Sequence, residues 1–371
     1  MRKSASEIFK LLPVKKLNLF LSLPVLILVV SLVILLLALK PAIENSAGIA
    51  RSLNIQCQSD VSNRCFRNFF ASYAKEHSFE ESKAVLSELQ KINSSTRYCH
   101  GIAHTISIAE VGKNPGNWLE AFNYVPETEC SVGFFHGVIE GKYRTDPDFR
   151  VTSTLINEVC LENPMALKSA QSSGRCTHAF GHVLLVQDQG DISKSLATCR
   201  TLFSKITAHC YQGVFMENIQ RENLSEHGIA DREIWNQDYL ELQKAYCNDF
   251  SKELQNECWR SLGPVILAVV NSLNQGIAFC QTAPEYNSKR FCTREITGQG
   301  MVNELANGEE GGSLTDSCLA FADTGQYTNC VTDLVEYMLL TAVSYKPKIL
   351  EFCKITRDEA KFRCLDQVKN Y

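Results

Sequence analysis

The sequence predicts an all-α protein: an N-terminal transmembrane helix followed by a solenoid of repeated α-helical hairpins that disulfide bonds hold together. Three observations lead to this prediction. An uncharged, apolar segment occupies residues 17–39, all 16 cysteines lie after it, and apolar segments that begin with cysteine recur at intervals near 34 residues. With 371 residues, of which 45% are hydrophobic, the chain can bury a substantial core.

Residues 17–39 are long enough, as a helix, to cross the roughly 30 Å hydrocarbon layer of a bilayer. The preceding residues 1–16 contain five Lys or Arg residues and one acid, whereas Lys40 and Arg51 are the only cations soon after the segment. Because positive charge stays on the cytoplasmic side, this tail is expected in the cytoplasm. We therefore predict a single-pass anchor in the plasma (inner) membrane, with residues 40–56 as a linker and residues 57–371 as a periplasmic or extracellular domain.

A cleaved signal peptide is the alternative interpretation of residues 17–39. The apolar region of such a peptide is typically about 7–15 residues long and is followed closely by a cleavage site with small residues. This segment is longer, and the sequence from Ala38 to Pro41 is a poor cleavage site. An uncleaved anchor is therefore favoured.

The charge balance bears on the kind of partner. Five of the 37 Lys and Arg residues and one of the 41 acids lie in the N-terminal tail, so 32 cations face 40 acids from residue 40 onward. This net negative part of the chain is poorly suited to nucleic acid or to anionic lipid headgroups. A protein or peptide is the expected partner, and membrane contact is expected through the N-terminal helix.

Nine cysteines stand at the start of similar, largely apolar segments, and each segment predicts a helix. Successive gaps between them are 34, 31, 46, 34, 48, 34, 38 and 34 residues, the mark of a helical array. The nine are Cys65, Cys99, Cys130, Cys176, Cys210, Cys258, Cys292, Cys330 and Cys364.

The other seven cysteines each precede one of the nine by 8 to 16 residues. A helical hairpin accounts for this spacing: one cysteine near the end of the first helix is bonded to one at the start of the second. Cys99 and Cys130 lack such upstream neighbours and could pair with each other. An even number of cysteines on the translocated side indicates disulfides formed in an oxidising compartment.

The period of about 34 residues, together with the regular cysteine pairs, resembles the tetratricopeptide and Sel1-like helical repeats, particularly their cysteine-rich extracytoplasmic versions. The resemblance covers about residues 57–371 and rests on period and cysteine placement. It implies a concave surface that binds protein or peptide.

A second candidate function comes from histidines clustered between residues 99 and 182. Two His-x-x-x-His pairs occur there, and residues four apart share one helix face, so each pair can present two imidazoles to a metal ion such as zinc. The candidate ligands are His100, His104, His136, Glu140, His178 and His182.

Helix packing limits how these residues can combine. Neighbouring helices pack about 8–10 Å apart, which predicts that the two histidine pairs lie roughly 16–20 Å apart, too far for one ion to bridge. His136 can join either pair, with Glu140 as an added ligand or base. The alternative is that these are buried histidines bonded to nearby backbone, or a polar stripe along a groove.

No catalytic signature is present: the sequence contains no CxxC, CxxCH, Walker loop, HExxH or GxSxG motif. We therefore expect a membrane-anchored scaffold that binds protein or peptide, with a metal-binding protein or metal-dependent enzyme as the alternative. A purely structural envelope component is a third possibility.

Overall fold

A computed structural model shows a protein built from helices, with no strand in the part of the chain that it describes. The described residues are 28, 31, 45–58, 64–93, 99–125, 130–146, 148–163, 170–202, 207–220, 235–270, 272–307, 318–319, 324–341 and 346–370. The predicted anchor at 17–39 therefore lies outside the described residues, apart from positions 28 and 31. Among the helices that are described, none combines the length and the apolar character needed to cross a bilayer.

The helices fall into two groups by their place relative to the cysteines. Those that contain or directly follow the nine recurring cysteines are α2 (Arg64–Glu76), α4 (His100–Lys113), α5 (Ser131–Thr145), α7 (Ala170–Gln187), α9 (Thr207–Gln220), α11 (Lys252–Ser261), α14 (Tyr286–Asn307), α16 (Thr324–Thr341) and α18 (Asp358–Asn370). The others are α3 (Phe79–Ile92), η3 (Pro115–Tyr124), α6 (Ser153–Ile156), η4 (Asn157–Glu162), α8 (Ile192–Leu202), α10 (Gln237–Asn248), α12 (Gly263–Val269), α13 (Leu273–Cys280) and α17 (Lys346–Ile355).

All 16 cysteines are joined in eight disulfides; the seven predicted short-range pairs are confirmed, and Cys99 and Cys130, whose pairing the sequence left open, are bonded to each other. Seven bonds join a cysteine to the next one along the chain across a short turn. The eighth, Cys99–Cys130, spans 31 residues and joins the starts of α4 and α5. The bonds are Cys57–Cys65, Cys99–Cys130, Cys160–Cys176, Cys199–Cys210, Cys247–Cys258, Cys280–Cys292, Cys318–Cys330 and Cys353–Cys364.

The prediction that each recurring cysteine starts a helix is only partly right. Cys99 and Cys130 are the N-cap residues of α4 and α5, but Cys176, Cys258 and Cys292 lie well inside their helices. A disulfide requires the two Cα atoms to approach to about 5.5 Å, and that approach occurs where the paired helices touch. A helix can begin a turn or more before that point, so the cysteine marks the contact between helices and not the helix start.

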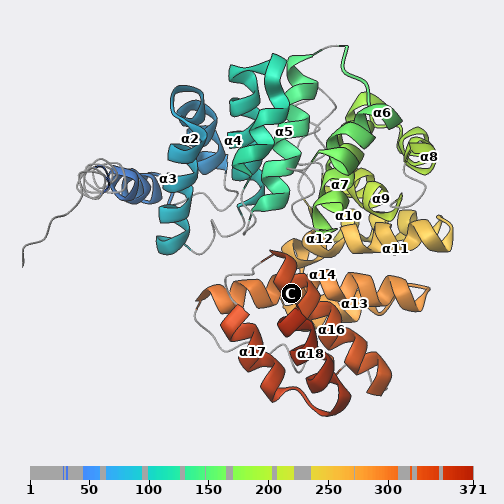
Figure 1. The fold of residues 1–371 in the computed structure, drawn as a ribbon. Coiled ribbons are helices and arrows are strands. Elements are labelled where there is room, and N and C mark those ends of the chain that lie inside the picture. Colours follow the sequence, from blue (N-terminus) through green and yellow to red (C-terminus); the bar gives the residue numbers. More distant parts are fainter. Residues whose placement is uncertain are drawn as a thin grey trace, which may run out of the picture.

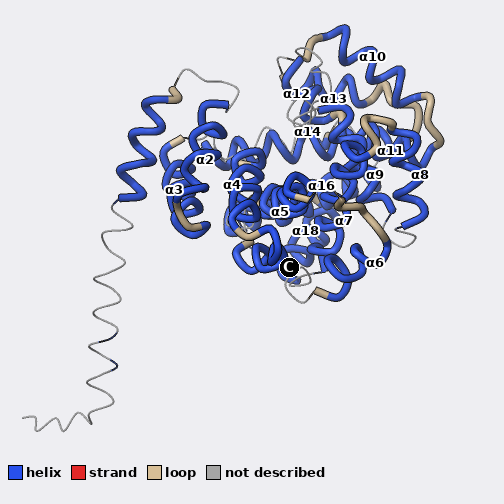
Figure 2. The backbone as a smooth tube through the Cα atoms, turned by 90° about the horizontal axis from the view of Figure 1, so that it is seen from above, coloured by secondary structure: helices blue, strands red, loops and turns tan. Residues whose placement is uncertain are grey.

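The cysteine-bearing helices pack against one another in chain order. α2 contacts α4, and the contacts continue through α5, α7, α9, α11, α14 and α16 to α18. Figure 1 shows this succession from the blue helices to the red ones, with the remaining helices lying outside it. In Figure 2, seen from above, helix covers almost all of the described backbone.

The buried apolar residues form two clusters along this succession. The larger runs from Ala50 to Ile296 and the smaller from Met301 to Val368, so the division falls within α14. Each cluster includes disulfide sulfurs at the contacts between paired helices. The polar site described next lies inside the larger cluster.

Candidate metal centre

Three neighbouring helices bring five histidines into one buried cluster. α4 supplies His100 and His104, α5 supplies His136, and α7 supplies His178 and His182. His136 lies in the middle, with only 1% of its surface exposed, and the other four surround it. All five histidines were candidate ligands from the sequence.

Glycines let the helices approach closely enough for these rings to meet. Gly133 and Gly137 of α5 lie against the backbone of His100 and His104, and a Cβ at either glycine would overlap a carbonyl oxygen of α4. In the same way Gly213 of α9 lies against the carbonyl oxygen of His178. Only the hydrogen side chain fits at such a backbone contact, which is why glycine occupies these positions.

The distances between the rings differ from the sequence-based expectation. The ring centroid of His136 is 4.7 Å from that of His100 and 4.8 Å from that of His178. Both histidine pairs therefore reach the same central ring, and the expected separation of roughly 16–20 Å between the pairs was wrong. The expected separation describes the distance between helix axes, whereas the side chains of α4 and α7 extend inward toward α5.

Two buried glutamates hold the second histidine of each pair. Glu140 Oε2 of α5 is 2.7 Å from Nδ1 of His104, and Glu217 Oε2 of α9 is 2.7 Å from Nδ1 of His182. Since an ionised carboxylate can only accept, each imidazole carries its proton on Nδ1 and presents its Nε2 lone pair. Carboxylates in this position orient histidine ligands in metal sites.

Glu140 was predicted as an added ligand or base, but its contacts favour a different role. Its second oxygen, Oε1, accepts hydrogen bonds from Arg144 at 2.9 and 2.5 Å. With both oxygens held by protein groups, Glu140 fits the role of orienting His104. Glu217 was missed from the sequence, although its spacing of 35 residues after His182 nearly repeats the 36 residues between His104 and Glu140.

Burial keeps the central imidazoles neutral. The pKa of His136 is lowered well below the usual 6.5, first by burial and then by the neighbouring His182 and His100. Burial, followed by His182, likewise lowers the pKa of His178. A neutral imidazole is the form that donates a lone pair to a metal, so both rings are in the ligating state at neutral pH.

Two sets of three histidines have ligand atoms close enough to hold a metal ion. Within each set these atoms all lie within 4.8 Å of one another, and His136 belongs to both. The sets are His100, His104 and His136, and His136, His178 and His182. In addition, His136 Nε2 is buried and has no hydrogen-bond partner in the described part of the chain, although such atoms are normally satisfied.

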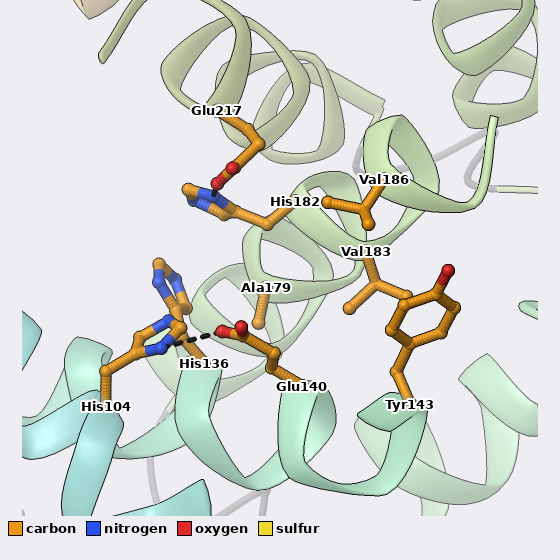
Figure 3. Close-up of a pocket in the computed structure, with 9 residues that line it drawn as sticks. All are labelled: His104, His136, Glu140, Tyr143, Ala179, His182, Val183, Val186 and Glu217. Carbon is orange, nitrogen blue, oxygen red and sulfur yellow. Dashed lines mark hydrogen bonds and ion pairs between the residues drawn. The ribbon is translucent and has the colours of Figure 1, made fainter. Parts of the chain in front are cut away.

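A small cavity adjoins the cluster, and Figure 3 shows its lining. The rings of His104, His136 and His182 lie on one side, and Tyr143 and Val183 lie on the other. The space free for a solvent-sized group is about 10 Å³, which is close to what one water molecule needs. The cavity thus accommodates an ion with a water molecule but no organic molecule.

The remaining histidines lie apart from this centre. His77 is partly exposed and stacks on Tyr73 with ring centroids 3.8 Å apart. His209 is packed against Gly174, and burial followed by the nearby Arg260 lowers its pKa. His227 lies outside the described residues.

Comparison with known proteins found no family model, no curated protein and no solved structure that matches this chain.

Proposed function

We propose that the protein binds a transition-metal ion, zinc or copper, in the histidine cluster between α4, α5 and α7. The observation that supports this most directly is the convergence of five imidazoles from three helices around His136. Imidazole is a preferred ligand of both metals. The carboxylates behind His104 and His182 complete the pattern expected of a metal site.

A cluster kept only by hydrogen bonds explains these residues less well. His136 Nδ1 is 3.1 Å from His100 Nε2, and His182 Nε2 is 3.1 Å from His178 Nε2, so one proton can be shared in each pair. That sharing leaves the buried Nε2 of His136 unsatisfied. Burying such an atom costs about 1–3 kcal/mol, a cost that a bound cation removes.

The cavity favours binding over the conversion of an organic substrate. About 10 Å³ is free beside the histidines, enough for one water molecule. Organic ligands occupy pockets of roughly 300–1,000 Å³. Metal storage, electron transfer or a structural role of the ion therefore fits the site better than an open hydrolytic centre.

Elemental analysis tests the proposal directly. The full chain is purified in mild detergent without chelator, and a second sample is stripped with chelator and titrated with Zn(II) and Cu(II). We expect at least one tightly held ion per chain, lost in His136→Ala and retained in the control His77→Ala, which changes a histidine outside the cluster. A wild-type chain that retains no metal and takes up neither ion would refute the proposal.

We further propose that residues 17–39 anchor the protein in the plasma (inner) membrane, with the metal site in the periplasm or outside the cell. The eight disulfides support an oxidising compartment. Reporter fusions test this: a C-terminal alkaline phosphatase should be active and a C-terminal fluorescent protein of the kind that folds only in the cytoplasm should be dark. The opposite pattern would contradict the orientation.

A scaffold function, with a repeat solenoid of the tetratricopeptide or Sel1-like kind, is the second proposal. The succession of helix contacts from α2 to α18 supports it, because arrays in which each unit touches its neighbours build extended binding surfaces. Crosslinking in intact membranes followed by capture of the tagged chain should recover a specific protein or peptide. Recovery of nothing above an untagged control would count against a scaffold while leaving metal binding untouched.

A further inference from the structure

The histidine cluster consists of two similar halves. In one half α4 carries a His-x-x-x-His pair, and α5 approaches it through Gly133 and supplies Glu140 to the second histidine. In the other half α7 carries the second pair, and α9 approaches it through Gly213 and supplies Glu217. The distance between glutamate oxygen and Nδ1 is 2.7 Å in both halves.

His136 is shared by the two halves, and the second half has no counterpart to it. It lies six residues after Cys130, and the position six residues after Cys210 is Met216. Its ring is stacked on His178 at an interplanar angle of 12° and is edge-on to His100 at 79°. Nδ1 is turned toward His100 at 3.1 Å, whereas Nε2 is buried and meets no hydrogen-bond partner among the residues that the structure describes.

One ion cannot use all five histidines in this arrangement. Nitrogens bound to a single zinc ion at about 2.0–2.1 Å lie no more than about 4.2 Å apart. The ligand atoms instead form two separate sets of three, each within 4.8 Å and overlapping only at His136. The ligand atoms of each set must move closer together to bind one ion, since 4.8 Å exceeds that limit.

We propose that the cluster holds two metal ions, one in each half, with the His136 ring as a bridge between them. This inference rests on the proposed metal-binding function. His100 and His104 bind the first ion with one nitrogen of His136, and His178 and His182 bind the second ion with its other nitrogen. When the second ion binds, the ring N–H proton of His136 leaves to solvent, and the resulting imidazolate donates one lone pair to each ion.

The two glutamates give each half the same supporting group. Glu140 and Glu217 carry negative charge next to His104 and His182, and so they offset part of the charge that two divalent ions bring into a buried site. The imidazolate offsets one further charge. Each half therefore has its own carboxylate behind one of its histidines, as expected of a histidine ligand in a metal site.

Copper titration of the chelator-stripped full chain in detergent tests the bridge. Metal content measures the stoichiometry, and electron paramagnetic resonance detects whether two Cu(II) ions are magnetically coupled. We expect two ions per chain, with the signal of the first ion falling as the second binds, and release of one additional proton with the second ion. The His77→Ala variant should behave like the wild type.

Variants in each half give a matched comparison. His182→Ala should bind one ion and His104→Ala should bind one ion, both with an ordinary uncoupled signal. His136→Ala removes a ligand of both ions, so it should hold no tightly bound ion and give no coupled signal, and a helical circular-dichroism spectrum equal to that of the wild type confirms that the variant is folded.

Three results would overturn the inference: one ion per chain, two ions without coupling in the wild type, or coupling that persists in folded His136→Ala. With one ion per chain, metal binding itself still stands. With no ion at all, both proposals fail, so the two failures are distinguishable.

Discussion

The first and second parts of the helix succession use buried polar groups in opposite ways. Between α4 and α9 the buried groups are imidazoles gathered around His136, and two glutamates hold His104 and His182. From α11 to α16 they are arginines and acids that pair with one another, as Arg290 does with both oxygens of Asp333. The second part places opposite charges next to each other, whereas the first brings ring nitrogens together in pairs 3.1 Å apart.

The difference occurs at matching positions of the helices. The residue two places after the recurring cysteine is His178 in α7, Arg260 in α11 and Arg294 in α14. Arg260 pairs with Glu257 at 2.9 Å, and Arg294 reaches Glu336 at 3.4 Å. One position in the helix thus carries a histidine of the proposed metal site in one part of the molecule and an ion-paired arginine in the other.

The largest loss of stability is expected from adding a side chain at a glycine where two helices of the histidine cluster touch. Gly213→Ala places a methyl group against the backbone of His178, which cannot move aside as a side chain can. We expect destabilisation at or above the upper end of the about 1–3 kcal/mol typical of overpacking, and loss of metal binding, measured by denaturant unfolding and metal analysis. Gly112→Ala is the control, because nothing lies within 4 Å of the added group, and it should be neutral or slightly stabilising.

Breaking an ion pair in the second part should affect stability without affecting the metal. Asp333→Ala leaves Arg290 without its carboxylate, and we expect a loss of about 1.5–3 kcal/mol in the free energy of unfolding. Metal content and copper signal should equal those of the wild type. A change in metal affinity in this variant would show that the two parts are coupled.

The supporting glutamates should influence metal affinity more than folding. Glu140→Gln and Glu217→Gln keep the shape of the side chain but remove its charge, and each should weaken metal binding about 10- to 100-fold. Competition with a chelator of known affinity measures this change. Glu336→Gln, in the ion-paired part, is the matched control, and equal weakening there would contradict a local role for the two glutamates.

The histidine part should make the metal-free protein sensitive to acid. His136 and His178 have lowered pKa values when folded, so the unfolded chain binds more protons than the folded one below about 6.5. Stability is therefore fully present above that pH and is lost as the pH falls below it. Urea midpoints of the chelator-stripped protein at several pH values measure the slope, which should be shallower in His136→Gln.

The smallest effect of pH on stability is expected from Glu257, in the ion-paired part, and it has the opposite sign to that of the histidines. Burial raises the pKa of Glu257 above the usual 4.5, because it outweighs the attraction of Arg260. The folded state therefore holds this proton more tightly, and the contribution of Glu257 to stability is lost as the pH rises from 4.5 through the raised value. Relative to the wild type, Glu257→Gln should gain stability over that range, and a gain that shrinks with rising pH would contradict this sign.

Much of this architecture is predictable from the sequence, because local rules govern it. The capping box of Ser78 and Glu81 at the start of α3, for example, joins residues only three positions apart. Cysteine spacing was sufficient to predict seven of the eight disulfides, since a short loop between two helices leaves only the nearest sulfur within reach, whereas Cys99 and Cys130, 31 residues apart, were only a possible pair. The five histidines were also found from their helical spacing.

The arrangement around His136 depended on tertiary packing. Helix spacing alone placed the two histidine pairs too far apart, because it takes no account of how far side chains reach inward from α4 and α7. Glu217 was missed because it stands on a helix without a His-x-x-x-His pair, and only packing brings it to His182.

The sequence by itself therefore determined the helices, their disulfide pairing and the identity of the histidines, since these follow from contacts between residues that are close in the chain. Only the tertiary structure decided that one imidazole lies between two pairs and that a glutamate stands behind each. The physical reason is that such contacts join residues about 35 positions apart, and their geometry depends on how closely glycines allow the helices to approach.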